Sequence, residues 1–521
     1  MSEQHQITKA ATIIGTGTLL SRIFGCLRDM VIAYFFGAGM AADAFFVAFR
    51  LPNLWRRLVG EGSLTISFIP VYTDYLTRRT KEESKEVAYV AFTIATILLL
   101  LLTVVGIIYS PILIRMIAPR WSPISEKFQL TVTLNRIIFP YLFFMGLFAL
   151  CMGILNSLRH FFAPAFAPIF LNISILVSVF LFYPVLETPV MALAVGVLVG
   201  GVLQFLFQIP FLLKKGFNFR FNFNFRHPAI KRIGSLMVPG LIGTAVYQLN
   251  VFIDTIFATS LPDGSVSYLF YADRLIEFPL GVFAIAIGMA ALPSLSELAS
   301  KGRMEEMKET ISFAFRLVSF ISIPATVGLI ALKTPIINLY LQRGVFNYHA
   351  TAMTVKALLY YSVGLWAIAG VRVIAPAFYS LQDTKTPLKI ALICLGTNII
   401  LNFILIHPLK HAGLALATSL SSILNLVLLS RNLNTRLGGV DLNKNIHSLL
   451  TIFLCSLPVG LVAYLICSLR NWNAPGDAVE KVCLLSLGIV AGLGVYLLGS
   501  YWMKNEEMLF LLKMIKREKS R

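Results

Sequence analysis

Charged side chains are scarce in this sequence of 521 residues. They make up 13% of the chain, and 57% of the residues are hydrophobic, whereas soluble domains carry about 25% charged residues. Apolar runs recur from Ala10 to Met503, and each is long enough to cross a hydrocarbon core of about 30 Å. The mean hydropathy of +0.79 agrees with this pattern. The composition therefore excludes a soluble protein.

The usual signatures of enzymes and metal sites are also missing. The sequence contains no Walker A motif, no H-E-x-x-H and no G-x-S-x-G. Its six cysteines lie in or beside apolar runs without C-x-x-C spacing, which favours helix packing over disulfides or metal ligands. The N-terminus has no A-x-A cleavage site, so we expect the first apolar run to remain as a helix. We expect a membrane protein that is not an enzyme and needs no resident cofactor.

Hydropathy predicts an all-α integral membrane protein with about fourteen transmembrane helices, because a chain in lipid must satisfy its own backbone hydrogen bonds. The predicted spans are 10–37, 41–73, 87–116, 128–158, 163–183, 188–213, 233–260, 266–299, 309–336, 350–380, 387–406, 412–430, 446–468 and 481–503.

The basic residues predict the orientation of these spans. With the N-terminus in the cytoplasm, 25 lysines and arginines fall in cytoplasmic segments or at the span ends beside them, and 7 fall in outer loops or at the span ends beside those. A bias of this size favours both termini in the cytoplasm. The net charge of +19 would then face anionic inner-leaflet lipid, and not nucleic acid.

Two pairs of segments predict an internal repeat. AFFVAFRLPNL (44–54) resembles SYLFYADRLIE (267–277) at an offset of 224, and ILNSLRHFFAP (154–164) resembles AFYSLQDTKTP (377–387) at an offset of 223. Each half holds six predicted spans, which indicates two six-helix lobes in a parallel repeat. The predicted domains are 1–213, a basic linker at 214–232, 233–432, and 433–521 with two extra C-terminal helices. We interpret the linker as a plain loop, with a short hairpin or an interfacial segment as alternatives.

Twelve further basic residues fall within the predicted spans or directly beside them. An arginine at mid-bilayer costs about 2.5–3.5 kcal/mol on insertion scales, so several together need a function. Because guanidinium binds phosphate oxygens bidentately, we predict a cavity for a phosphate-bearing amphiphile. The arginines that line this cavity would be Arg22, Arg28, Arg50, Arg56 and Arg274. Their positive charge would be balanced in part by Asp29, Asp43 and Glu277.

Local spacing adds detail to this cavity. Arg274 and Glu277 are three residues apart, so they can pair along a helix. Gly25 lies between the charges of the first span and would let another group approach closely. Structural ion pairing or snorkelling to the interface is the alternative reading for every buried arginine, and it carries most weight for Arg56 and Arg57.

Polar residues in the second half suggest a cation site. Asn398 and Asn402 are four residues apart on one helix face, and oxygen ligands suit a hard cation. The predicted ligands are Asp254, Asn398, Asn402 and Thr418, which would couple transport to Na⁺ or H⁺. Hydrogen bonds that hold the helices together are the alternative explanation.

Four segments resemble the MurJ/MviN family of bacterial inner-membrane lipid II flippases. They are SRIFGCLRD (21–29), FFGAGMAADAFFVAFRLPNLWRRLVGEGSL (35–64), GSVSYLFYADRLIEFPLGVF (264–283) and APAFYSLQDTKTPLKIA (375–391). The resemblance implies two lobes around a cationic cavity, with a groove for the lipid tail at two extra helices. It implies substrate contacts at Arg22, Arg28, Arg56 and Arg274, supported by Asp29, Asp43, Arg50, Arg57, Ser267 and Glu277.

The expected function is therefore translocation of lipid II across the bacterial cytoplasmic membrane by alternating access. The expected protein acts as a monomer beside the cell-wall synthesis machinery. The alternatives are an exporter of another polyprenyl-diphosphate oligosaccharide, a drug exporter, a membrane glycosyltransferase or a cell-wall scaffold without transport. Arginines in the cavity argue against a cationic drug as cargo, and the short, acid-poor loops argue against a metal-dependent transferase.

Overall fold

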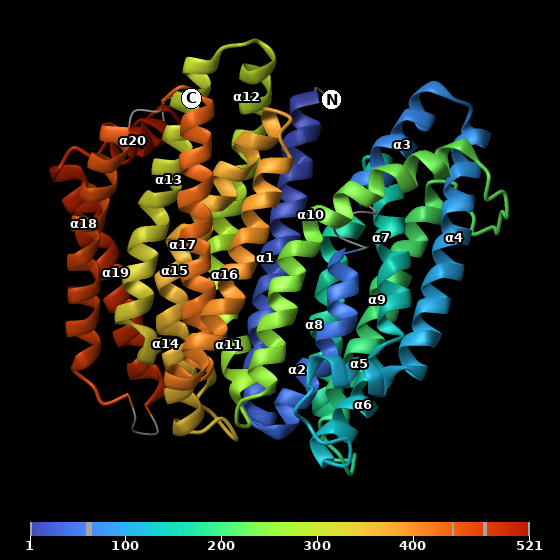
Figure 1. Cartoon of the computed structure of the whole chain (residues 1–521), viewed down its shortest axis with the longest axis horizontal. Helices are drawn as coiled ribbons and strands as arrows, with labels where there is room; N and C mark the ends of the chain where they lie inside the picture. Colours follow the sequence, from blue (N-terminus) through green and yellow to red (C-terminus); the bar gives the residue numbers. More distant parts are fainter. Residues whose placement is uncertain (1–2, 59–64, 440–441, 473–476, 519–521) are drawn as a thin grey trace. The chain divides into compact units, whose positions relative to one another are not determined.

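A computed structural model describes residues 3–58, 65–439, 442–472 and 477–518 (Figure 1). In these ranges every regular element is a helix. The chain divides into two compact units, Met1–Ser267 and Tyr268–Arg521. An all-helical structure is the expected answer to a bilayer environment, since each helix satisfies its backbone hydrogen bonds internally.

The first unit holds ten complete helices among the described residues. They are α1 (Glu3–Phe36), α2 (Met40–Trp55), α3 (Thr65–Arg78), α4 (Lys81–Ile108), α5 (Ser110–Ile117), α6 (Glu126–Ile138), α7 (Tyr141–Ser157), α8 (Phe162–Phe182), α9 (Met191–Lys214) and α10 (Pro228–Thr259). Helix α11 (Ser265–Pro279) begins in this unit and continues into the second.

The second unit continues from α11 through a π-helical turn, η2 (Leu280–Ala284). Its other helices are α12 (Ile285–Ser300), α13 (Met304–Ala331), α14 (Lys333–Leu341), α15 (Tyr348–Ser380), α16 (Lys385–Leu409), α17 (His411–Arg436), α18 (Leu442–Ser468), α19 (Ala478–Trp502) and α20 (Glu506–Glu518).

Eleven helical segments of the described residues are long and apolar enough to cross a membrane. They coincide with eleven of the predicted spans; α6 with α7, and α11 with α12, each form one of these segments. Helices also occupy the other three predicted segments, as α1, as α2 and α3, and as α10. Residues 59–64 of the predicted span 41–73 lie outside the described residues.

Small residues bring α1 and α8 together in the first unit. A Cβ at Gly17 would lie 2.6 Å from the carbonyl oxygen of Ala165, so only glycine fits at this crossing. At Gly25 the nearest atoms, those of the Asn172 side chain, lie at an ordinary 3.9 Å from such a Cβ. The predicted close approach therefore occurs at Gly17, two turns earlier than expected.

The linker between α9 and α10 packs on α4. Residues 217–224 take no regular secondary structure, as expected of a plain connecting loop. The Phe217 ring contacts Tyr89, and the Phe219 ring contacts Phe92. The backbone N–H of Asn222 donates a hydrogen bond to the Thr93 hydroxyl at 2.8 Å.

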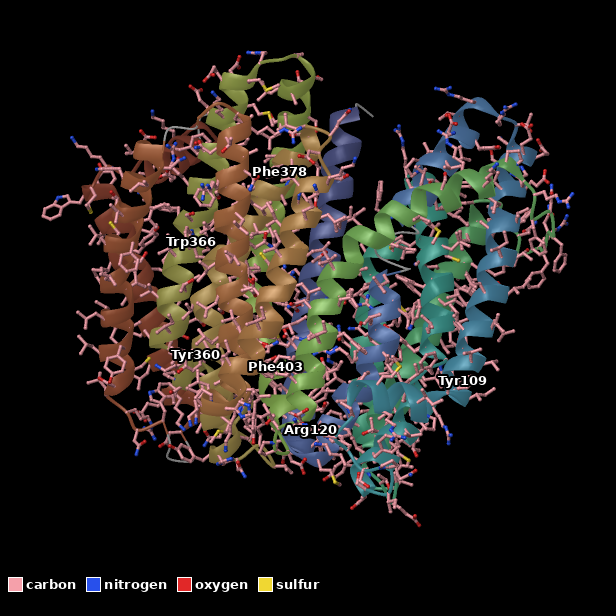
Figure 2. All side chains as sticks on the ribbon, viewed as in Figure 1. Tyr109, Arg120, Tyr360, Trp366, Phe378 and Phe403 are labelled. Carbon is pink, nitrogen blue, oxygen red and sulfur yellow. The ribbon has the colours of Figure 1, made fainter. Side chains whose placement is uncertain are left out.

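Helix α15 lies at the centre of the second unit, against α12, α13 and α17 (Figures 1 and 2). Its Phe378 is fully buried, and the Trp366 indole N–H donates to Ser319 of α13 at 2.9 Å. Helices α18 and α19 join this core through α13, where the Tyr496 hydroxyl donates to the Phe320 carbonyl at 2.7 Å. By contrast, Phe403 of α16 is 61% exposed, as a side chain facing lipid would be.

Candidate substrate-binding and gating residues

Arg28 belongs to a buried cluster between α1 and α8. Its guanidinium donates to the Asp29 carboxylate at 2.6 and 2.9 Å and to the Asn172 side-chain oxygen at 3.0 Å. Asn172 in turn donates to the Ser21 carbonyl at 3.1 Å. Arg28 is 8% exposed and Asp29 2%. A buried charge is stable only when it is paired and hydrogen-bonded, and this cluster supplies both conditions.

The other candidate arginines of the first unit are more accessible. Arg22, Arg50, Arg56 and Arg57 are all partly exposed. Arg22 lies six residues before Arg28 on α1, or about 9 Å along the helix axis. Arg56 donates to the Asn53 side chain at 2.9 Å. The acceptor in this bond is an uncharged amide oxygen.

Asp43 holds the densest polar cluster among the predicted residues. Its side chain is 1% exposed. It accepts from Ser267 through both the backbone N–H at 3.0 Å and the hydroxyl at 2.7 Å, and from the Gly264 N–H at 2.8 Å. The carboxylate therefore caps the N-terminus of α11, where four backbone N–H groups lack partners within the helix and a negative charge is favoured.

Lys127 of α6 completes this cluster. Its ammonium donates to Asp43 at 2.9 Å and to Asp263 at 2.7 Å, and it lies 4.4 Å from the centre of the Trp121 ring. The Trp121 indole donates to the Thr259 carbonyl at 2.8 Å. The start of α2, the start of α6 and the turn before α11 are thus joined by charge-assisted hydrogen bonds.

Arg274 and Glu277 form the ion pair expected from their spacing. The Arg274 Nη1 atom donates to the Glu277 carboxylate at 3.0 Å. Their side chains are 30% and 32% exposed, and the guanidinium lies 5.0 Å from the centre of the Phe270 ring. Both partners are therefore more accessible than the buried Arg28 and Asp29.

The predicted cation ligands fall in both units. Asn402 donates to Asn398 at 2.9 Å, and both are fully buried in the second unit. The Thr418 hydroxyl donates to the Leu414 carbonyl at 3.0 Å. In the first unit, Asn250 donates to Asp254 at 3.3 Å. Within the described residues, no three His, Cys, Asp or Glu side chains gather as a metal site.

The structure therefore joins several predicted residues in pairs: Asp43 with Ser267, Arg28 with Asp29, Arg274 with Glu277, and Asn398 with Asn402. The sequence did not single out Asn172, Lys127, Asp263 or Gly264, which complete these clusters. The sequence does contain one signal for the contact between Asp43 and Ser267. The pair Asp263 and Gly264 is typical of a turn, and the two serines that follow, Ser265 and Ser267, are typical of the start of a helix.

This chain is similar in sequence to proteins of one known family. A family model described as "Lipid II flippase MurJ" matches residues 32–482. The chain is 36% identical over 505 residues to a Vibrio cholerae protein named "Probable lipid II flippase MurJ", covering 95% of this chain and 96% of that protein. It is also 36% identical over 432 residues to "Lipid II flippase MurJ" of Burkholderia cenocepacia, covering 82% and 84%.

Solved structures show the same similarity in three dimensions. A structure of "Lipid II flippase MurJ, inward closed conformation" aligns with a TM-score of 0.79 at 27% identity, covering 95% of this chain and 99% of that chain. An inward-facing multidrug transporter of the MATE family aligns with a TM-score of 0.69 at 14% identity, covering 82% and 98%. The latter likeness concerns the fold alone.

Proposed function

Because the chain belongs to the lipid II flippase MurJ family, we propose that it moves lipid II from the inner to the outer leaflet of the bacterial cytoplasmic membrane. It acts as a transporter and not as an enzyme. The observation that carries this proposal beyond the family assignment is a set of partly exposed arginines in segments that the sequence predicts to span the membrane, Arg22, Arg56 and Arg274. Placing such charges in a bilayer costs free energy. Favourable interactions of the arginines with a diphosphate-linked lipid would offset this cost.

The proposed architecture has fourteen spans, with lobes at 1–213 and 233–432, a linker at 214–232 and a C-terminal part at 433–521. The 25-to-7 bias of basic residues supports cytoplasmic termini. A further observation supports the repeat, since Asp43 and Ser267 are separated by the same 224 positions as Arg50 and Arg274. Residues at matching positions of the two halves would thus contact each other at the first turns of α2 and α11.

Substrate binding is assigned to Arg22, Arg28, Arg56 and Arg274, with Asp29, Asp43, Arg50, Arg57, Ser267 and Glu277 in support. The diphosphate would displace Glu277 from Arg274, since a dianionic group offers more acceptor oxygens than one carboxylate. Arg28 would need to leave Asp29 and Asn172 before it could contact cargo. Arg28 is therefore the arginine whose binding requires the largest local rearrangement.

The Asp43 cluster would keep the outer end closed. Opening toward the outside requires the first turn of α11 to separate from Asp43, which breaks three hydrogen bonds and exposes a buried carboxylate. Lys127 offsets that carboxylate while the cluster is closed. The four contacts around one carboxylate form or break together, which suits an element with two discrete states.

The driving force is proposed to come from ion gradients or the membrane potential. Moving one charge through 100 mV is worth about 2.3 kcal/mol, so a cationic cavity responds to potential. Asp254, Asn398, Asn402 and Thr418 would bind Na⁺ or receive H⁺. Transport that is unchanged in Asp254→Ala and in sodium-free buffer would contradict this coupling.

Two further partners follow from the charge distribution. The basic cytoplasmic segments would contact anionic inner-leaflet lipids. The protein would act as a monomer beside the cell-wall synthesis machinery, without nucleic acid as a partner.

A rescue experiment tests the proposed function. Cells depleted of their own flippase would express this chain, and a protease- or colicin-type assay would measure lipid II that reaches the outer leaflet. We expect the wild-type chain to restore both the lipid II signal and growth, and Arg22→Ala to restore neither at equal membrane abundance. Growth rescued by Arg22→Ala without a lipid II signal would favour the scaffold alternative.

A further inference from the structure

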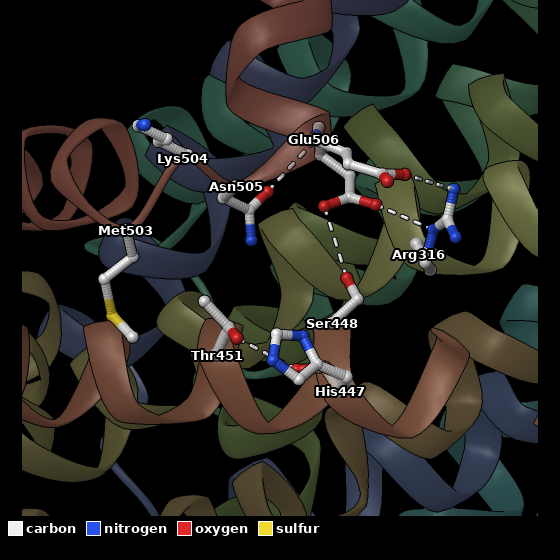
Figure 3. Close-up of a pocket in the computed structure, with 9 residues that line it drawn as sticks. Arg316, His447, Ser448, Thr451, Met503, Lys504, Asn505 and Glu506 are labelled. Atoms are coloured by element: carbon white, nitrogen blue, oxygen red, sulfur yellow. Dashed lines mark hydrogen bonds and ion pairs between the residues drawn. The ribbon is translucent and has the colours of Figure 1, made fainter. Parts of the chain in front are cut away.

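A pocket with a volume of about 260 Å³ lies where α18, α19 and α20 meet α13 (Figure 3). One ordered water needs only roughly 10–15 Å³, so a larger polar group fits. The side chains that matter below are Arg316, His447, Ser448, Lys504, Glu506 and Glu507. None of them belongs to the proposed substrate-binding or cation-binding set.

The charges in this pocket are arranged as a dipole. Arg316 is 6% exposed, and it faces the carboxylates of Glu507 at 2.8 Å and Glu506 at 3.3 Å. One guanidinium thus faces two carboxylates on that side of the pocket. In Figure 3, Lys504 lies on the side of Asn505 away from Arg316 and supplies the opposite charge.

The buried ion pair retains hydrogen-bonding capacity. Glu507 is 1% exposed, and Ser448 donates to one of its oxygens at 3.2 Å. Arg316 Nε and Glu507 Oε1 lie 2.8 Å apart as an ion pair. A carboxylate has about four lone-pair sites, so Glu507 can accept further hydrogen bonds from a polar group in the pocket.

The pocket lies at the end of two membrane spans. His447, Ser448 and Thr451 are in the first turns of the span Asn445–Ser468, and Lys504 follows directly after the span Ala478–Trp502. Trp502 is 89% exposed, and exposed tryptophan is typical of the boundary between lipid and water. The pocket therefore sits at the depth where phospholipid headgroups lie.

The same two helices offer an apolar surface next to this boundary. Leu450 and Leu454 of α18 are 57% and 54% exposed, and Leu498 of α19 is 71% exposed. Acyl chains can cover these side chains while a headgroup occupies the polar pocket. The combination fits a lipid better than a free soluble molecule.

We propose that this pocket binds the headgroup of a zwitterionic phospholipid that carries a primary ammonium next to its phosphate. The ammonium donates hydrogen bonds to Glu506 and to the free lone pairs of Glu507, and the phosphate accepts from Lys504. An anionic headgroup without an ammonium would place its charge near two carboxylates that share one arginine. A quaternary ammonium has no N–H to donate to Glu507.

Native mass spectrometry of the full-length protein tests this site. The protein would be delipidated and titrated separately with phosphatidylethanolamine, phosphatidylcholine and phosphatidylglycerol. We expect tight retention of one phosphatidylethanolamine, with about 5- to 10-fold weaker retention in Lys504→Ala and in Glu506→Gln. Both residues are exposed, so these variants should fold.

The matched controls are Lys301→Ala and Glu297→Gln, which alter an exposed ion pair at the end of α12 and should leave retention unchanged. Equal retention of the three lipids, or retention that both pocket variants leave intact, would overturn the proposal. Free phosphoethanolamine competing as well as the lipid at equal concentration would also overturn it, since the pocket would then bind a soluble ligand. A failure here leaves the lipid II assay unaffected.

Discussion

The Asp43 cluster and the Arg274–Glu277 pair place charge in very different surroundings. The Asp43 carboxylate is almost completely buried and accepts four hydrogen bonds from three residues, Lys127, Gly264 and Ser267. The Arg274–Glu277 pair joins two residues of one helix, and about a third of each side chain is exposed. The buried cluster is suited to holding helices in place, whereas the exposed pair is suited to exchanging partners with an anion.

This difference arises because exposure sets the strength of an ion pair. Breaking a buried pair leaves an uncompensated charge, which costs about 3–5 kcal/mol, whereas a solvent-exposed pair contributes about 0–1 kcal/mol. We therefore expect a ligand to displace Glu277 from Arg274 more easily than it displaces Asp43 from its donors. Displacing Asp43 from its donors requires a conformational change that moves the helices themselves.

The largest expected effect is that of Asp43→Asn on stability. The amide keeps the shape of the side chain but removes the charge that Lys127 and the N-terminus of α11 require. We expect the free energy of unfolding to fall by about 3 kcal/mol, measured by thermal melting in detergent. Asp74→Asn is the control, because Asp74 forms exposed ion pairs with Arg78 and Arg232. Equal melting of the two variants would show that the Asp43 cluster contributes no more than a surface pair.

The next largest effect concerns transport by Arg274→Ala. Removal of the guanidinium should lower the lipid II signal in the outer leaflet by about 10- to 100-fold, because charge-assisted hydrogen bonds to the diphosphate are lost. The melting temperature should change little. A variant that melts early and transports at a normal rate per folded molecule would place Arg274 among the structural charges.

A smaller effect is expected for Asn172→Ala on α8. Arg28 would lose the acceptor at 3.0 Å but keep Asp29, so stability should fall by about 1–2 kcal/mol. Ile173→Ala, at an exposed neighbouring position, is the control for side-chain truncation. If Asn172→Ala melts like this control, the contact between α1 and α8 does not depend on the Arg28 cluster.

The smallest expected effect concerns how stability depends on pH. It comes from Asp383, which lies in the turn before α16. Hydrogen bonds from Thr386 lower the pKa of the Asp383 carboxyl, and Arg436 lowers it further. Since the folded-state pKa lies below the usual value, about 3.9, this stabilisation is present above about pH 4 and disappears as the pH falls through the folded-state pKa. Thermal melting between pH 7 and pH 3 should show a loss of at most about 1 kcal/mol that Asp383→Asn lacks.

The sequence predicted what depends on local spacing. Arg274 and Glu277, three residues apart, form the expected pair. Asn398 and Asn402, four apart, lie close together on one helix face, where they share a hydrogen bond that was not itself predicted. The helical segments followed from hydropathy because lipid allows few alternatives to a helix. These features require no knowledge of which helices pack together.

The contacts that the sequence did not predict join residues far apart in the chain. Arg28 meets Asn172 across 144 positions, and Lys127 meets Asp43 across 84. Asparagine in an apolar helix and lysine near the end of a predicted span are common, so neither residue type signals its partner. Packing of α1 on α8 and of α2 on α6 decides these contacts.

The central claim is that Arg274 binds the cargo whereas Asp43 holds helices in place. Equilibrium binding of purified lipid II to the wild-type protein, to Arg274→Ala and to Asp43→Asn tests it most directly. Each protein would be measured at a temperature where it is fully folded. We predict that Arg274→Ala weakens binding at least about tenfold and that Asp43→Asn stays near the wild-type affinity. The reverse pattern, with binding lost in Asp43→Asn and kept in Arg274→Ala, would contradict the account.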